Sequence, residues 1–333
     1  MRALFGAGRT TPGSVVGAVL SVAMLLLALA IVHPLTIASL LGQIRPEYAV
    51  VALLLNVPVT VVRALRADVA VRHFGCAVPF RRMLAVQLVG QTYSALSPAA
   101  TGDLVRAYLW KRDQDLPYAK GVAVVSFERV YSLGLMALVA ALLVLLPRHG
   151  AWAWGLVGLG LTAGTFLPLL AARVPRAVQR SILGRLDGHP LGSRLLRGAG
   201  ELQALTSEPL LLAKVSALTL TIFALSGLQV LALLVSLGVR VPITQAVAAY
   251  TISQVAGIVS VLPFGLGPAD IVVAGVLAGY GVTLATSASL AILLRAASTL
   301  PTAAAALPAY LLLQRGRDVP LRLLGRAAAR MES

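Results

Sequence analysis

Charged residues and cysteines are both scarce in this sequence. Of its 333 residues only 12% are charged and 58% are hydrophobic, and the mean hydropathy is +0.88, whereas a soluble domain has about 25% charged residues. This composition excludes an ordinary water-soluble domain. The one cysteine, Cys76, excludes an intrachain disulfide and a thiolate metal cluster. The scattered histidines give no zinc spacing. We therefore expect a membrane protein, from its composition, and neither a metal nor a cofactor in it.

The charge balance is strongly basic, with a formal net charge of +16. Such an excess is typical of nucleic-acid-binding proteins, but here the charges lie in short gaps between long uncharged runs, as in the loops of membrane proteins. We therefore expect no nucleic-acid partner. The sequence also has no Walker loop, no H-E-x-x-H motif and no nucleophile elbow. We expect no catalytic residues, and no enzymatic activity.

Long apolar runs predict an all-α polytopic membrane protein. A helix needs about 20 apolar residues to cross the hydrocarbon core, and six runs fit a full transmembrane helix: 14–32, 48–65, 120–146, 152–172, 214–237 and 283–313. Two further apolar stretches, 83–110 and 243–280, are broken near their middle by proline and glycine, which interrupt a helix. We read each as a re-entrant pair of half-helices. The breaks are Pro98 and Gly102 in the first pair, and Pro263, Gly265 and Gly267 in the second.

Lysines and arginines predict the orientation. If both termini are cytoplasmic, most basic residues fall on the cytoplasmic side, as the positive-inside rule requires. Among them are Arg63, near the end of the 48–65 run, and Arg66, which directly follows that run. We expect the protein in the cytoplasmic membrane of a prokaryote. The membrane domain comprises residues 1–313, with a cytoplasmic connecting loop at 173–213, and residues 314–333 form a basic cytoplasmic tail.

The two broken stretches have the same order of residues. In each, a glutamine precedes the break, an acid follows it, and an arginine lies in the next helix: Gln91, Asp103 and Arg129 in the first, Gln254, Asp270 and Arg295 in the second. The first pair enters from the cytoplasm and the second from outside. This pattern predicts an inverted-topology repeat over about 48–146 and 214–313, an arrangement in which transporters bind substrate near the midplane.

Six charged residues fall within the predicted membrane zone: Asp103, Arg106, Glu128, Arg129, Asp270 and Arg295. Charge there costs about 2.5–3.5 kcal/mol per residue at a helix centre, so these side chains must face the interior or a wet cavity. One interpretation is a set of structural ion pairs, for instance Asp103 with Arg106. The other is a binding site for a lipid head group, with Arg129 and Arg295 as phosphate partners and Gln91 and Gln254 beside them.

A weaker motif is Asp113-Gln-Asp115, which matches the D-x-D sequence of metal-dependent glycosyltransferases. It lies in a short connector with no nucleotide-binding domain around it. We interpret it as a solvated loop and expect no metal site there.

Four motifs together carry a family resemblance: Gly102-Asp-Leu-Val-Arg106-Ala, Phe127-Glu128-Arg129, Leu262-Pro-Phe-Gly-Leu-Gly267-Pro-Ala-Asp270 and Leu294-Arg295. As a set they resemble the membrane domain of the lysylphosphatidylglycerol synthase family, also called flippase-like. Asp270 stands where that family more often has glutamate. The resemblance implies movement of modified lipids between leaflets, and we expect this chain to lack the soluble aminoacyl-transfer domain.

Three functions follow from the sequence. The first is a flippase or transporter for an anionic phospholipid or a lipid-linked intermediate. The second is a non-transporting partner in a cell-envelope lipid or glycan synthesis complex, and the third is an integral-membrane enzyme acting on a lipid phosphate. Membrane lipids are the expected ligands, and a second copy of the chain or an envelope-synthesis enzyme is the alternative protein partner.

Overall fold

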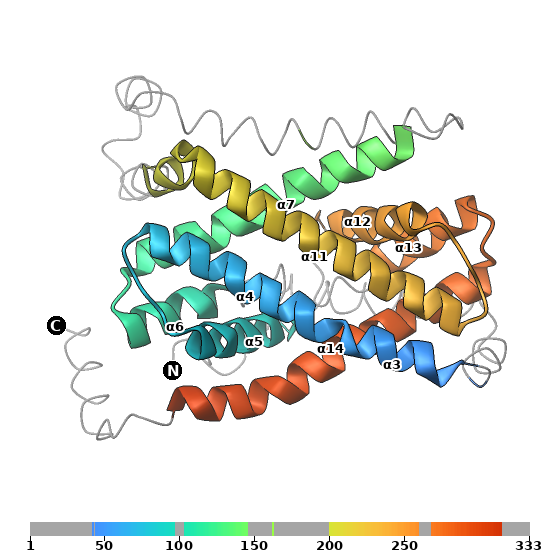
Figure 1. Cartoon of the computed structure of the whole chain (residues 1–333), viewed down its shortest axis with the longest axis horizontal. Coiled ribbons are helices and arrows are strands. Elements are labelled where there is room, and N and C mark those ends of the chain that lie inside the picture. Colours follow the sequence, from blue (N-terminus) through green and yellow to red (C-terminus); the bar gives the residue numbers. More distant parts are fainter. Residues whose placement is uncertain are drawn as a thin grey trace, which may run out of the picture.

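The computed structural model describes residues 42, 44–96, 103–145, 162, 200–259 and 268–314, and every regular element in this part of the chain is helical (Figure 1). The described helices fall into two sets with the same order. Each set has a long helix, two shorter helices and a second long helix.

The first set begins with α3 (Pro46–Leu54) and α4 (Asn56–His73), which run on from each other through Leu55. The shorter helices are α5 (Phe80–Leu96) and α6 (Leu104–Gln114), and the closing long helix is α7 (Tyr118–Leu145). Pro46 occupies the first turn of α3, where its missing N–H leaves no hydrogen bond unmade.

The second set begins with α11 (Pro209–Ser236), again with a proline in the first turn. The shorter helices are α12 (Ile243–Val259) and α13 (Pro268–Gly279), and the closing long helix is α14 (Leu284–Gln314). Gly75 after α4 and Gly238 after α11 both have positive φ, 77° and 79°. Glycine adopts this conformation at little cost, and both long helices turn into the next short helix there.

Four of the predicted spans coincide with helices long and apolar enough to cross a membrane. These helices are Pro46–His73, Tyr118–Leu143, Pro209–Ser236 and Leu284–Gln314, at the positions of the predicted 48–65, 120–146, 214–237 and 283–313 spans. The other two spans, 14–32 and 152–172, lie outside the described residues. So do Pro98, Gly102, Pro263, Gly265 and Gly267, most of the 173–213 loop, and the tail beyond Gln314.

The shorter helices form two hairpins that enter from opposite ends of the molecule. Within the first, α5 packs against α6, and the Cys76 thiol ahead of α5 lies 3.6 Å from the Gln114 carbonyl oxygen at the end of α6. Within the second, α12 packs against α13. The start of α3 lies beside the end of α11, where the second hairpin follows, because the Arg45 amide donates to the Ser236 carbonyl oxygen at 3.0 Å. In Figure 1 the first hairpin opens at the left end and the second at the right.

The two halves are interleaved. The hairpin helix α5 packs against α14 of the second half, and the corresponding helix α12 packs against α7 of the first half. Within each half the matching contacts also repeat, α4 with α5 and α6 with α7, α11 with α12 and α13 with α14. The described part of the chain therefore shows an internal repeat of contacts, in agreement with the repeated order of residues.

The apolar interior is divided into two clusters. One gathers side chains such as Met83, Trp110 and Phe127 around α5, α6 and the first part of α7. The other gathers side chains such as Phe223 and Leu290 around α11 to α14. Large apolar side chains on the long helices also remain exposed, including Val57, Leu210 and Leu307, as expected of surfaces that face lipid.

Candidate functional site

A cavity of about 600 Å³ is lined by residues of both halves of the molecule. Its size is within the range of small-molecule binding sites. All eight residues predicted to bind a head group line it: Gln91, Asp103, Arg106, Glu128, Arg129, Gln254, Asp270 and Arg295. The structure thus gathers residues that are spread over some 200 positions of sequence into one site.

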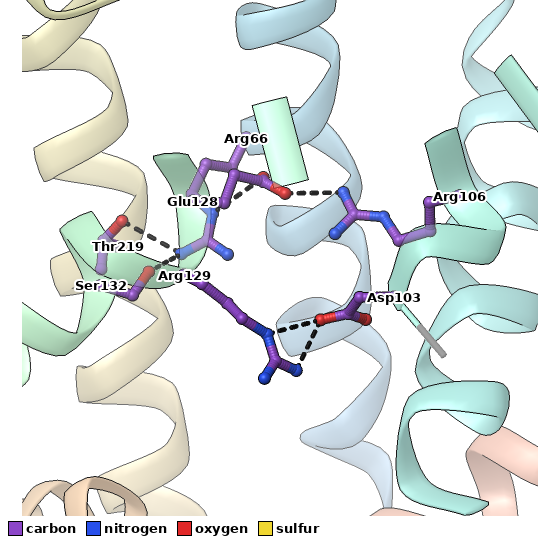
Figure 2. Close-up of polar contacts among 7 residues, drawn as sticks. All are labelled: Arg66, Asp103, Arg106, Glu128, Arg129, Ser132 and Thr219. Carbon is purple, nitrogen blue, oxygen red and sulfur yellow. Dashed lines mark hydrogen bonds and ion pairs between the residues drawn. The ribbon is translucent and has the colours of Figure 1, made fainter. Parts of the chain in front are cut away.

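The first ion pair joins α7 to the beginning of α6. Arg129 donates from Nε and Nη2 to Oδ2 of Asp103, at 2.9 and 2.7 Å, and from Nη2 to the Ser94 hydroxyl at 3.2 Å. Asp103 immediately precedes α6. Figure 2 shows the guanidinium of Arg129 turned towards this carboxylate. The pair fixes the start of a hairpin helix to the long helix that follows it.

The second ion pair repeats this arrangement in the other half. Arg295 of α14 donates from Nε to Oδ1 of Asp270 at 2.9 Å and from Nη2 to Oδ2 at 2.6 Å, a bidentate contact. Asp270 lies in the first turn of α13, where a carboxylate is favoured by the helix dipole. Both side chains are about a quarter exposed, 28% for Arg295 and 25% for Asp270, so the pair lies at the cavity wall.

Glu128 of α7 is held between two arginines from different helices (Figure 2). Arg106 of α6 donates from Nη2 to its Oε2 at 2.7 Å, and Arg66 of α4 donates from Nε to its Oε1 at 3.2 Å. Arg66 also donates from Nη1 to the Ser132 and Thr219 hydroxyls at 2.7 and 3.2 Å. Glu128 is 2% exposed and Arg106 4%. These three side chains form a buried cluster, which we call the Glu128 triad.

The structure corrects two of the sequence expectations. Asp103 and Arg106 do not pair with each other, because Asp103 is bound by Arg129 and Arg106 by Glu128. Arg63 and Arg66, which we counted among the cytoplasmic residues at the end of the 48–65 run, belong to α4 inside a candidate span and line the cavity. The predicted span ended at Leu65, one residue before Arg66, whereas α4 continues to His73. Buried Ala64, Ala67 and Val71 continue the helical repeat past that point and are the signal that could have found them.

Positive charge is in excess around the cavity. Among the described residues its lining contains five arginines, at 63, 66, 106, 129 and 295, against three carboxylates, at 103, 128 and 270. The two Arg–Asp pairs are neutral, the Glu128 triad has a formal charge of +1, and among the described residues Arg63 makes no ion pair. The gaps in the hairpins, 97–102 and 260–267, contain no charged residue in the sequence. The site is therefore suited to an anion.

Gly90 makes room for the Glu128 triad. A Cβ atom at this position of α5 would overlap Cγ and Cδ of the Arg106 side chain. Arg106 therefore reaches Glu128 by passing directly over the backbone of α5. The absence of a side chain at residue 90 is a packing requirement of the site.

The Asp113-Gln-Asp115 motif lies at the end of α6, away from the cavity lining. Arg112 donates to both carboxylate oxygens of Asp113, at 2.7 and 3.0 Å. Asp115 caps α6 in the left-handed conformation with φ of 53°. Across the described ranges no three His, Cys, Asp or Glu side chains gather as a metal site. The motif here forms a helix end.

Comparison with known proteins identifies a family and a relative of known name. The family model described as the lysylphosphatidylglycerol synthase TM region matches residues 14–306. A protein of Haloferax volcanii named Glycosyltransferase AglD is 25% identical over 287 residues, which cover 76% of this chain and 46% of that protein. The chain thus spans about half the length of this relative. Our expectation that the chain has no enzymatic activity is wrong on this comparison, because the relative is named as an enzyme.

Proposed function

We propose a lipid-moving function for this chain, which belongs to the lysylphosphatidylglycerol synthase TM region family and is a multi-pass membrane protein of lipid or glycan pathways. In this proposal the protein moves an anionic phospholipid or a lipid-linked intermediate between the leaflets of the prokaryotic cytoplasmic membrane. The head group enters the cavity and the acyl or prenyl chains stay in the bilayer.

The observation that carries the proposal is the positive excess of the cavity lining, five arginines against three carboxylates. An uncompensated guanidinium in a membrane interior is costly, and a phosphate lowers that cost by pairing with it bidentately. Arg63 and the Glu128 triad supply the excess. An anionic head group of two charges neutralises this formal excess, and one of a single charge halves it.

The hairpins give the proposal a mechanism. We take them as re-entrant pairs of an inverted repeat, with the N-terminal ends of α6 and α13 at the cavity through Asp103 and Asp270. Such ends present free backbone N–H groups and the positive end of the helix dipole to an anion. Arg129 and Arg295 exchange their aspartate partners for the head-group phosphate when substrate binds, and the aspartates recover them when it leaves.

A reconstitution assay tests this function. Phosphatidylglycerol with a fluorescent acyl chain is placed in both leaflets of proteoliposomes, and an impermeant quencher added outside reports the lipid that reaches the outer leaflet. We expect the wild-type protein to accelerate quenching of the inner-leaflet fraction, and Arg129→Ala/Arg295→Ala to return it to the protein-free rate. Arg81→Ala/Arg82→Ala is the matched control, since both arginines are exposed in the first turn of α5. Equal rates for the two double variants contradict the proposal.

A second candidate function is a part in glycosyl transfer to a lipid phosphate, either as the enzyme or as its membrane partner. It is favoured by the name of the Haloferax volcanii relative. The test incubates purified protein with nucleotide sugars and a short-chain prenyl phosphate, and detects the glycosylated lipid by mass spectrometry. Turnover, or stable co-purification of a glycan-synthesis enzyme together with null lipid movement, supports this second candidate over the first.

A further inference from the structure

The cavity has two walls at which long helices from different halves cross. At the first crossing α14 passes the joint between α3 and α4 (Figure 1), and at the second crossing α7 passes α11. The repeat makes the two crossings equivalent, because Thr302 lies seven residues after Arg295 in α14 as Met136 lies seven residues after Arg129 in α7. Thr302 and Met136 both line the cavity. The two walls can therefore be compared position by position.

Large apolar side chains close the second crossing. Met136 of α7 and both Ile222 and Phe223 of α11 line the cavity there, and they are 8%, 3% and 2% exposed. All three belong to one apolar cluster. The α7 helix contains no proline, and α11 contains none after its first turn, so both helices run unbroken past the cavity. Packing therefore seals this wall.

Small side chains line the first crossing instead. Thr299, Thr302 and Ala303 of α14 and Asn56 of α4 all line the cavity at this wall. Ala303 is also exposed on the surface of the described structure, and Leu300, one turn before it, is 66% exposed. An exposed leucine on a membrane-spanning helix marks a face that lies against lipid. The cavity therefore reaches the lipid-facing surface at the first crossing.

Proline interrupts both helices of the first crossing. Pro58, in the first turn of α4, has no N–H to donate to the Leu54 carbonyl oxygen at the end of α3. Pro301 lies inside α14, directly before Thr302, and cannot donate to the Ala297 carbonyl oxygen. Helices kink at such prolines. Two interrupted helices thus meet at one wall of the cavity, and two continuous helices meet at the other.

A side-chain hydrogen bond joins the two interrupted helices. Nδ2 of Asn56 donates to Oγ1 of Thr302 at 3.1 Å, and the same hydroxyl donates to the Ser298 carbonyl oxygen at 2.7 Å. On the other side of the joint, Nε2 of Gln229 in α11 donates to the Ala52 carbonyl oxygen of α3 at 2.9 Å. The joint is thus held to α11, whereas α14 packs on α5. The hydrogen bond between Asn56 and Thr302 therefore links two parts that have separate supports.

We infer that the first crossing is a lateral opening of the cavity, through which the hydrocarbon chain of a bound lipid reaches the bilayer, and that the Asn56–Thr302 hydrogen bond holds it closed. This rests on the proposed lipid-moving function and adds the route of the chain. Parting the first crossing breaks a neutral hydrogen bond, whose net contribution is small. Parting the second crossing would separate closely packed apolar side chains. The opening therefore lies on one side of a fold that otherwise repeats.

The first test cross-links the opening shut. In a Cys76→Ser background, which has no other cysteine, Asn56→Cys/Thr302→Cys is joined by a short bis-methanethiosulfonate linker and reconstituted for the phosphatidylglycerol quenching assay. We expect lipid movement to fall by about tenfold or more, because the opening step is blocked, and a reductant to restore it. The matched control is Tyr131→Cys/Ser216→Cys, which links α7 to α11 outside the cavity lining, where the two native hydroxyl oxygens are 2.6 Å apart. Its linker should leave the rate unchanged.

A milder variant serves if the cysteine pair fails to fold. Thr302→Val keeps the shape of the side chain and removes the hydroxyl that holds Asn56. We expect lipid movement to rise by about two- to tenfold, the range that one net hydrogen bond gives. Ser289→Ala, on the same helix, loses only a bond to the Ala285 carbonyl oxygen outside the cavity lining and should keep the wild-type rate. An unchanged or slower rate in Thr302→Val contradicts the role of this hydrogen bond.

A labelling experiment locates the chain without relying on lipid movement. Phosphatidylglycerol and diacylglycerol, each with a diazirine in the middle of one acyl chain, are photolysed with the purified protein in detergent, and labelled peptides are identified by mass spectrometry. Diacylglycerol corrects for chains that only touch the outer surface. We expect phosphatidylglycerol to give excess label at 56–59 and 299–303, and none at 136 or 222–223.

The outcomes separate this inference from the proposed function. If the linked protein moves lipid at the unlinked rate, or the excess label lies on α7 and α11, the opening is wrong while the lipid-moving function stands. If the wild type moves no lipid but the excess label lies at the first crossing, the route of the chain stands and the lipid-moving function is wrong. If the wild type moves no lipid and phosphatidylglycerol gives no excess label, both are wrong.

Discussion

Arg129 and Arg295 occupy the same position in their helices. Arg129 lies eleven residues after Tyr118, the first residue of α7, and Arg295 lies eleven residues after Leu284, the first residue of α14. Each binds an aspartate at the start of the short helix before it, with sequence separations of 26 and 25 residues. The two halves therefore present one ion pair each to the same cavity.

From this equivalence we predict matched effects of Asp103→Asn and Asp270→Asn. Each change frees one arginine for a phosphate, so binding of short-chain phosphatidylglycerol should strengthen and its release should slow. Because the pairs are partly exposed, each change should cost only about 1 kcal/mol of stability. Lipid titration and thermal unfolding in detergent measure both effects. Weaker lipid binding in both variants would argue against competition between aspartate and phosphate.

The Glu128 triad should be far more sensitive than either pair. Glu128→Leu leaves Arg66 and Arg106 buried without their carboxylate, and breaking a buried ion pair in this way costs about 3–5 kcal/mol. We expect a large fall in the thermal unfolding midpoint and poor yield from the membrane. The triple variant Arg66→Met/Arg106→Met/Glu128→Leu removes all three charges and should recover most of the stability. A triple variant as unstable as the single one contradicts this explanation.

Two glycine substitutions should have opposite effects. In Gly90→Ala the new Cβ overlaps the Arg106 side chain and should displace it from Glu128, at a cost of about 1–3 kcal/mol. Gly275→Ala in α13 meets no atom within 4 Å and should stabilise the helix by about 0.5–1 kcal/mol. Thermal unfolding of both variants measures the difference. Equal thermal unfolding midpoints for the two variants would contradict the packing role of Gly90, because Arg106 would then reach Glu128 even with a side chain at residue 90.

Cys76, in the connector between α4 and α5, should react slowly as a thiol. Its burial, and then the nearby charge of Asp115, raise the pKa of the thiol above its ordinary value. A smaller thiolate fraction at neutral pH lowers the rate of alkylation, and the rate should rise as the pH approaches the raised pKa. Asp115→Asn removes the charge while asparagine tolerates the left-handed backbone there. The pH profile of the alkylation rate should therefore shift to lower pH in this variant. An unshifted profile would mean that burial alone raises the pKa of the thiol.

The same thiol reports the orientation of the chain. It is the only cysteine in the sequence. If both termini are cytoplasmic, as the distribution of basic residues predicts, the connector that holds it faces the cytoplasm. An impermeant maleimide should label inside-out vesicles and leave intact cells unlabelled. Cys76→Ser gives the background. Labelling of intact cells would contradict the predicted orientation.

Much of the helical architecture follows from composition alone. Long apolar runs predict the four described spans, because the bilayer fixes helix length. The proline and glycine breaks predict two interrupted segments, but the breaks themselves lie outside the described residues. The repeated order of acid and arginine predicts that Asp103 and Arg129 correspond to Asp270 and Arg295, while the one ion pair named from the sequence, Asp103 with Arg106, is wrong. It does not predict their partners across helices.

The rest depends on how helices cross. Glu128 pairs with Arg66 and Arg106, which are 62 and 22 residues away, and no local spacing encodes those distances. From the sequence, Arg66 counts as cytoplasmic because it directly follows an apolar run, and the sequence does not distinguish such an arginine from one that turns back into the protein interior. The role of Gly90 depends on a side chain from α6 that passes over α5, which only the packed structure reveals.

The interleaved packing of the hairpins has a consequence for how such a protein can be assembled. Since α5 lies on α14 and α12 lies on α7, a polypeptide containing one half alone lacks the helix that covers its own hairpin. In the described part of the chain each half thus supplies the helix that covers the hairpin of the other, and covalent linkage keeps the two halves together.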